Sequence, residues 1–214
     1  MTAAATALGT HAPRDRILDA AARLFYERGI NSVSVDDVAH AAQSNKMTLY
    51  RHFRSKEGLV VAWLHATAQK ARAKWEEVED RNADPVARLH GLGRLMVDEI
   101  SEWMRGCPFG NSLAELSDPA HPAHAIIRDY FSFQRAWLER ACTQAGFAEP
   151  AGAADALFYI VRGTSSGLVI DDPHAFARRE ARALDMVIAS AGRAAALPRA
   201  FRPIGRPTRR PRRQ

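Results

Sequence analysis

The chain has 214 residues, of which 47% are hydrophobic; this composition is that of a globular protein with a substantial core and excludes a disordered one. No apolar run approaches the ~20 residues of a membrane span, residues 1–13 do not resemble a signal peptide, and two cysteines are too few for a secreted disulfide scaffold, so we expect a cytoplasmic protein. The formal charge of +6 is concentrated at one end, because residues 199–214 hold seven arginines and no acid, which leaves the rest of the chain near neutrality.

Helical periodicity dominates the sequence, and no convincing alternating strand pattern or hairpin signal stands out, so we predict an all-α fold of about nine helices. The first helix is expected over residues 14–28, with Gly29 as its stop. Ser34 and Asp37 resemble a capping box that opens a second helix. Good N-cap residues, Asn45 and Ser55, precede a third and a fourth helix. The further helix ranges expected are about 34–41, 46–52, 56–80, 85–106, 109–116, 123–145, 151–170 and 174–191.

The second and third predicted helices, with the short turn between them, have the lengths of a helix-turn-helix, whose second helix enters the major groove of DNA. The thirteen residues from Ser44 to Lys56 contain no acid, and their hydroxyls, amide and cations suit phosphate oxygens and base edges. The sequence therefore predicts a helix-turn-helix DNA-binding domain over residues 14–58, after a disordered N-terminal arm over residues 1–13.

Three segments carry a more specific pattern: residues 17–29 with ILDAA, LF and Gly29, residues 34–39 (SVDDVA), and above all residues 48–57 (TLYRHFRSKE). Over about residues 14–60 the chain thereby resembles the tetracycline-repressor (TetR) family of bacterial transcriptional regulators. Two positions depart from that family. Gln43-Ser44 stands where Gly-Val is common in the turn, and Met47 stands where a glycine often follows the lysine.

The resemblance implies DNA contacts for individual residues by position. Lys46, Thr48 and Met47 are candidates for base edges, and a thymine methyl suits Met47. Two of the residues expected to contact phosphate have an alternative placement. Tyr50 also suits an ordinary half-buried position between helices, and Lys56 a solvated position in the first turn of its helix. The candidates for phosphate contacts, beside the amino end of the fourth helix, are Ser34, Tyr50, His52 and Lys56, and the other expected DNA-binding residues are Ser44, Asn45 and Arg51.

For residues 59–195 the resemblance implies a helical ligand-binding and dimerisation domain. Its last two helices are expected to form a four-helix bundle with those of a second copy, and the homodimer would bind double-stranded DNA at a near-palindromic operator. Binding of a small-molecule effector would move the fourth helix and release the protein, most simply as a repressor. The side chains expected in the dimer interface are Leu157, Ile160, Val161, Thr164, Leu168, Phe176, Ala183, Val187 and Ser190.

A ligand pocket is expected among the fifth to eighth helices. For its aromatic candidates an ordinary core position is at least as compatible with the sequence, whereas Asn111 and Arg162 would be more telling if buried. Arg162 suits an acid at the dimer interface equally well. The candidate lining residues are Trp103, Cys107, Phe109, Asn111, Tyr130, Trp137, Phe158 and Arg162.

Other functions have less support in the sequence. Control by oxidation of Cys107 and Cys142, or by a protein partner, is the alternative to a small-molecule effector. Asp118, His121 and His124 match no metal-site spacing, and Asp36 and Asp37 are attributed to helix capping, so we expect no metal, no cofactor and no enzyme. Residues 196–214 are expected to be a disordered Arg/Pro-rich tail, in which Gly205-Arg206-Pro207 resembles an AT-hook core, although a merely solubilising tail fits as well.

Overall fold

The computed structural model describes residues 12–99, 105–167 and 172–191. Within these ranges the chain is all α, without strands, as the sequence predicts. No helix in these ranges is both long and apolar enough to cross a membrane. The N-terminal arm and the Arg/Pro-rich tail lie outside them. The helices are α1 (Pro13–Arg28), α2 (Val35–Ala41), α3 (Lys46–Phe53), α4 (Lys56–Arg81), α5 (Pro85–Glu99), α6 (Pro108–Glu115), α7 (Ala123–Gln144), α8 (Pro150–Gly167) and α9 (Pro173–Ala191).

The predicted caps of the second, third and fourth helices are confirmed. Ser34 Oγ accepts a hydrogen bond from the Asp37 backbone N–H at 3.1 Å, and the Asp37 carboxylate accepts one from the Ser34 backbone N–H at 2.8 Å. Asn45 Oδ1 accepts from the Thr48 N–H at 2.8 Å, and Ser55 Oγ from the Gly58 N–H at 2.9 Å. These bonds satisfy N–H groups that a helix start leaves without intrahelical partners, so α2, α3 and α4 each begin at a set residue.

The prediction that the fifth helix continues to residue 106 is wrong, because residues 105–107 are not helical. Gly106 has φ +79°, a left-handed conformation, and Cys107 is extended, as expected for a residue that precedes a proline. Pro108 then starts α6 as a separate short helix. The turn between α2 and α3 lacks a glycine and has Gln43 in the left-handed region instead, with φ +48°.

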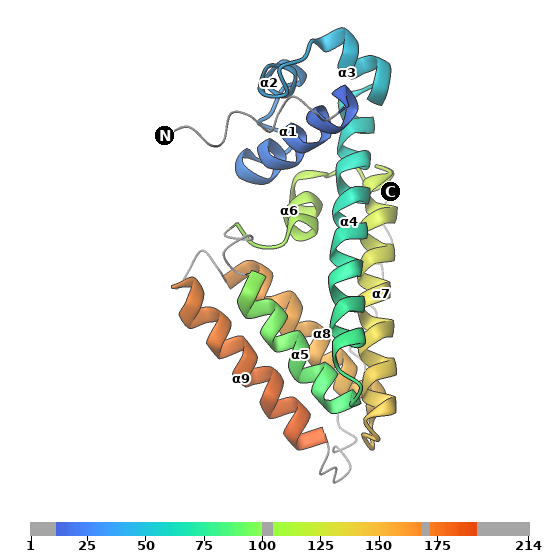
Figure 1. The fold of residues 1–214 in the computed structure, drawn as a ribbon, viewed down its shortest axis with the longest axis vertical. Helices are drawn as coiled ribbons and strands as arrows, with labels where there is room; N and C mark the ends of the chain where they lie inside the picture. The colour runs from blue at the N-terminus through green and yellow to red at the C-terminus, as the bar shows by residue number, and fades with distance from the viewer. Residues whose placement is uncertain (1–11, 100–104, 168–171, 192–214) are drawn as a thin grey trace, which may run out of the picture.

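The described helices form two large hydrophobic clusters that share α4 and α7, which run side by side along the long axis of the molecule (Figure 1), and a small third cluster lies around Ala177 of α9. The first cluster joins α1, α2 and α3 to α6 and to the adjoining parts of α4 and α7, with Phe25 packed on Trp63. The second joins α5, α8 and α9 to the other ends of α4 and α7, with Trp75 against Trp137. Helices α2 and α3 therefore lie at one end of the molecule, and α9 lies at the other.

Candidate nucleic-acid interface

Helix α3 turns one face inward and presents the rest to solvent. Leu49 and Phe53, four residues apart, are 0% and 6% exposed and belong to the first cluster. This spacing places both on one side of the helix, so the polar and cationic residues between them face outward. The outward-facing candidates from the sequence are Lys46, Met47, Tyr50, Arg51 and His52, which are exposed, and Thr48, which is half-buried.

Met47 and Tyr50 stand out on this face because they are large apolar side chains in water. Met47 is 83% exposed and Tyr50 is 41% exposed. Neither is held in the core, and each offers apolar area that a base methyl or a sugar could cover. Of the remaining candidates, Ser34 and Asn45 are exposed, whereas Ser44 and Lys56 are half-buried.

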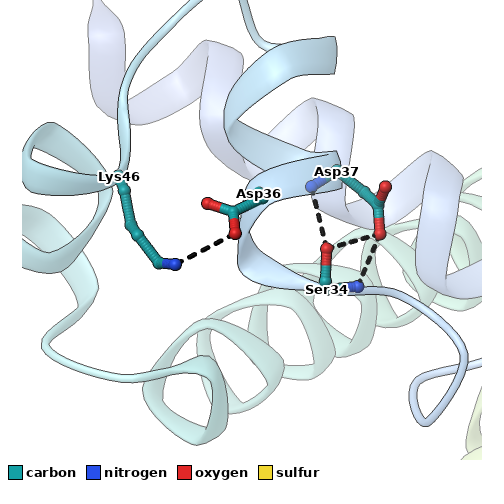
Figure 2. Close-up of polar contacts among 4 residues, drawn as sticks. All are labelled: Ser34, Asp36, Asp37 and Lys46. Atoms are coloured by element: carbon teal, nitrogen blue, oxygen red, sulfur yellow. Dashed lines mark hydrogen bonds and ion pairs between the residues drawn. The ribbon is translucent and has the colours of Figure 1, made fainter.

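Lys46 is already paired in the free protein. Its Nζ lies 3.0 Å from Asp36 Oδ2, and Figure 2 shows this ion pair joining the start of α3 to the first turn of α2. The hydrogen bond to Asp36 raises the pKa of the Lys46 ammonium above its ordinary value, so the lysine stays charged. The attribution of Asp36 to capping is wrong: Asp37, the third residue of α2, reaches back to the cap, and Asp36 points to α3 instead.

Ser34 uses its hydroxyl within the capping box. The hydroxyl donates to Asp37 Oδ2 at 2.6 Å while accepting from the Asp37 backbone N–H. This hydrogen bond from Ser34 lowers the pKa of the Asp37 carboxyl. A phosphate contact by the Ser34 hydroxyl would therefore compete with the cap of α2.

We expect Ser34→Ala to lower the free energy of unfolding by about 1 kcal/mol at neutral pH, because the cap of α2 is lost. Since the pKa of Asp37 is lowered in the folded protein, the stabilisation from its carboxylate is present above the ordinary carboxyl pKa and disappears as the pH falls through the lowered value. Urea titrations at neutral and at acid pH should show the effect of the substitution shrinking in acid. The control, Ser132→Ala on the exposed side of α7, should cost nothing; an equal loss in both variants would contradict the prediction.

The pocket candidates do not form one group. Phe109 and Tyr130 stack at 4.4 Å between ring centroids in the first cluster, and Trp137 lies in the second. Arg162 places its guanidinium 3.6 Å from the centre of the Phe131 ring, and its Nη1 lies 3.5 Å from Cys107 Sγ. Phe131 is not among the pocket residues expected from the sequence. Trp103 lies outside the described residues.

Asn111 and Phe158 occupy the edges of this region. Asn111 is half-buried and donates from Nδ2 to the backbone oxygen of Arg105 at 2.9 Å, so its amide already holds the loop before α6. Phe158 is half-buried, with its ring centroid 6.5 Å from that of Phe131. Among the described residues no group of three or more His, Cys, Asp or Glu is placed to hold a metal ion.

Comparisons with known proteins agree with this geometry. Residues 17–63 match the family model of bacterial regulatory proteins of the tetR family. The chain is 37% identical over 79 residues to the HTH-type transcriptional repressor KstR2 of Mycobacterium tuberculosis, a match that covers 37% of this chain and 40% of that protein. It is 37% identical over 121 residues to KstR2 of Rhodococcus jostii, covering 56% of this chain and 51% of the relative. The chain thus spans about two fifths to half the length of these curated relatives.

A likeness to a solved structure extends over most of the chain. A TetR-family transcriptional regulator from Streptomyces coelicolor superimposes with a TM-score of 0.81 at 28% identity, covering 84% of this chain and 96% of that one. The matched proteins are regulators and not enzymes. The family model, the curated relatives and this structural likeness together show that the chain resembles the TetR family of bacterial regulatory proteins, in sequence over residues 17–63 and in fold over most of its length.

Proposed function

We propose that this protein is a transcriptional repressor that binds a near-palindromic DNA operator as a homodimer and is released by a small molecule. The observation that carries the DNA-binding part is the outward face of α3, which is capped at Asn45, anchored by Leu49 and Phe53 and free of acidic residues. The matched relatives are themselves named HTH-type transcriptional repressors, which supports the same role here.

Selection of bound fragments from random duplex DNA tests this proposal. Because a two-fold dimer presents two copies of α3 about one helical turn apart (~34 Å), the recovered fragments should share an inverted repeat with that half-site spacing. A Lys46→Ala protein carried through the same selection should enrich the motif less. Recovery of no common motif, or of one without two-fold symmetry, would count against the proposal.

The dimer interface is proposed on α8 and α9, which pack against each other. The prediction that Leu157 and Val161 point toward a second copy is wrong, since both are buried in the second cluster of their own chain. Large apolar side chains that do face outward are Tyr159 on α8, 69% exposed, and Met186 on α9, 68% exposed. Of the other candidates, Ile160, Phe176, Ala183 and Val187 are half-buried, Ser190 is exposed, and the side chains of Thr164 and Leu168 lie outside the described part of the chain.

We expect Met186→Glu to convert the dimer to a monomer at micromolar concentration, because a carboxylate would have to be buried in an apolar interface without a partner. Sedimentation velocity measures the change directly. The control is Leu113→Glu, which places the same charge at another exposed apolar residue, on α6. If Leu113→Glu separates the subunits and Met186→Glu does not, the interface lies elsewhere.

Two connections support coupling between the helical domain after the helix-turn-helix, here called the body, and the DNA-binding end. Only two residues separate α4 from the end of α3, and α4 continues without a break into the second cluster, where Trp75 lies. Helix α6 provides the second connection, because its last residue, Glu115, accepts a hydrogen bond from the Asn31 N–H at 2.9 Å, just ahead of α2. We propose that effector binding moves α4 and, with it, this contact from α6.

The loop before α6 also contacts α1. The Arg105 backbone N–H donates to the Tyr26 hydroxyl at 2.7 Å, and the Arg105 guanidinium donates to the Tyr26 backbone oxygen at 2.6 Å. The loop before α6 is therefore bonded to α1, and the last residue of α6 is bonded to the segment that leads from α1 to α2. A displacement of α6 would be passed to the helix-turn-helix from two points.

One observation favours a second candidate, in which cysteine oxidation replaces the effector. Cys107 is half-buried, and Arg162 Nη1 lies 3.5 Å from its Sγ. Cys142 is not suited to this role, since burial raises its thiol pKa to about 11 and keeps it protonated. Peroxide-induced release from operator DNA by the unsubstituted protein, and loss of this release in Cys107→Ser, would support this second candidate.

A further inference from the structure

Two polar atoms on the inward face of α7 are buried without a hydrogen-bond partner. They are Gln134 Oε1, an acceptor, and Trp137 Nε1, a donor. The two side chains are 5% and 2% exposed. Leaving such atoms without a hydrogen bond costs free energy. An unpaired buried polar atom in a natural protein therefore points to a functional role or to a bound molecule as its partner.

Gln134 and Trp137 are three residues apart, so they lie on the same face of α7. The Gln134 amide already donates from Nε2 to the Tyr130 hydroxyl at 3.1 Å. This bond orients the amide and leaves Oε1 as an acceptor without a donor. Tyr130 belongs to the first hydrophobic cluster and Trp137 to the second. Gln134 therefore lies along α7 between a residue of the first cluster and a residue of the second.

The surroundings of these two atoms are aromatic. Trp137 packs edge to face on Trp75 of α4 at 5.2 Å between ring centroids, and Phe133 contacts the same Trp75 at 6.3 Å. On the other side Tyr130 stacks on Phe109 of α6. Trp137 thus connects this face of α7 to α4, and Tyr130, the hydrogen-bond partner of Gln134, connects it to α6; these are the two helices that lead to the DNA-binding end.

We propose that Gln134 and Trp137 are the polar end of the effector site, and that the effector is an uncharged aromatic or alicyclic molecule bearing a hydroxyl group. This inference rests on the proposed release by a small molecule. A hydroxyl donates one hydrogen bond and accepts others, so this one group supplies both the donor that Gln134 Oε1 lacks and the acceptor that Trp137 Nε1 lacks. A carboxylate brings no donor for the glutamine oxygen, and an ammonium brings no acceptor for the indole N–H. The apolar part of the molecule is then covered by the aromatic rings of α4, α6 and α7.

Three matched probes test the inference by isothermal titration calorimetry on the full-length protein: 2-naphthol, 2-methylnaphthalene and 2-naphthoate. They share one ring system and differ in whether it carries a hydroxyl, a methyl or a carboxylate. We expect 2-naphthol to bind about tenfold more tightly than 2-methylnaphthalene, the difference made by one well-placed hydrogen-bonding group, and 2-naphthoate to bind weakest. Equal affinities for the hydroxyl and the methyl probe, or no binding of 2-naphthol, would overturn the inference.

Substitutions show whether the preference comes from these two residues. Gln134→Leu keeps the volume and removes the amide, so 2-naphthol should lose its advantage; the free protein should unfold at the same or a higher temperature, because a buried unsatisfied atom is gone. Trp137→Phe should remove part of the advantage. Gln69→Leu makes the same exchange at an exposed position on α4 and should change nothing. If both Gln134→Leu and Trp137→Phe still bind 2-naphthol about tenfold more tightly than 2-methylnaphthalene, the assignment is contradicted.

The same probes, added to the complex with the selected operator, separate this inference from the proposed function. If 2-naphthol binds with the expected preference but does not release the operator DNA, the assignment of the binding site is supported. The result then contradicts the proposed release by a small molecule. If compounds without a hydroxyl release the DNA while Gln134→Leu leaves their effect intact, release by a small molecule stands and the assignment of Gln134 fails.

Discussion

Gly58→Ala is expected to destabilise the protein by about 1–2 kcal/mol, although alanine is ordinarily the better residue within a helix. A Cβ atom added to Gly58 would lie 2.2 Å from the backbone oxygen of Phe53. That oxygen belongs to the end of α3 and cannot rotate aside as a flexible side chain does. The first turn of α4 and the last turn of α3 would have to separate, which also displaces Lys56 and the outward face of α3.

Urea unfolding followed by tryptophan fluorescence measures this loss, and binding to the selected operator should weaken in parallel. Gly163→Ala serves as the control, because an added Cβ on α8 meets nothing within 4 Å. Its expected effect is a gain of about 0.5–1 kcal/mol from the helix preference of alanine alone. A Gly58→Ala protein as stable as the Gly163→Ala protein would show that the two helices are not held in this close contact.

Lys46→Ala and Asp36→Asn are expected to change operator affinity in opposite directions. Loss of Lys46 removes a candidate base contact and one positive charge, so affinity should fall by about 10- to 100-fold. The slope of log affinity against log salt concentration should become shallower by about one. Asp36→Asn should raise affinity by roughly 3- to 10-fold, because Lys46 is freed from its 3.0 Å ion pair and a negative charge near the phosphates is gone.

Fluorescence anisotropy with the selected operator at several salt concentrations resolves both effects. The control is Asp155→Asn, which breaks another surface ion pair, to Arg135 at 2.7 Å, between α7 and α8. It should leave affinity unchanged. If Asp36→Asn instead weakens binding as much as Lys46→Ala does, then Asp36 positions the lysine for DNA and does not compete with it.

Much of the candidate interface followed from sequence because its determinants are local. A cap forms between residues three positions apart, so Ser34 with Asp37, Asn45 and Ser55 predicted where α2, α3 and α4 begin. The helical spacing of Leu49 and Phe53 likewise places both on one side of α3, and that side is buried. The roles of the outward residues in DNA contact stay predictions until the operator is known.

The body was less predictable, since its apolar residues suit more than one partner. Leu157 and Val161 have the spacing of an interface stripe, and the same stripe fills the core of their own chain. A pattern of hydrophobic residues predicts which face of a helix is buried. It does not predict which surface covers that face. Only the packing of α8 on α7 and α9 decided between the two.

The sequence alone determined the all-α class, most of the helix starts and the chemistry of the helix-turn-helix, because these depend on side chains within one or two helical turns of each other. Tertiary structure alone decided the pairing of Lys46 with Asp36, the bond between Asn31 and Glu115, 84 residues apart, and the burial of Gln134 Oε1 without a partner. Each of these depends on which helix faces meet, and that is set by the packing of the whole chain.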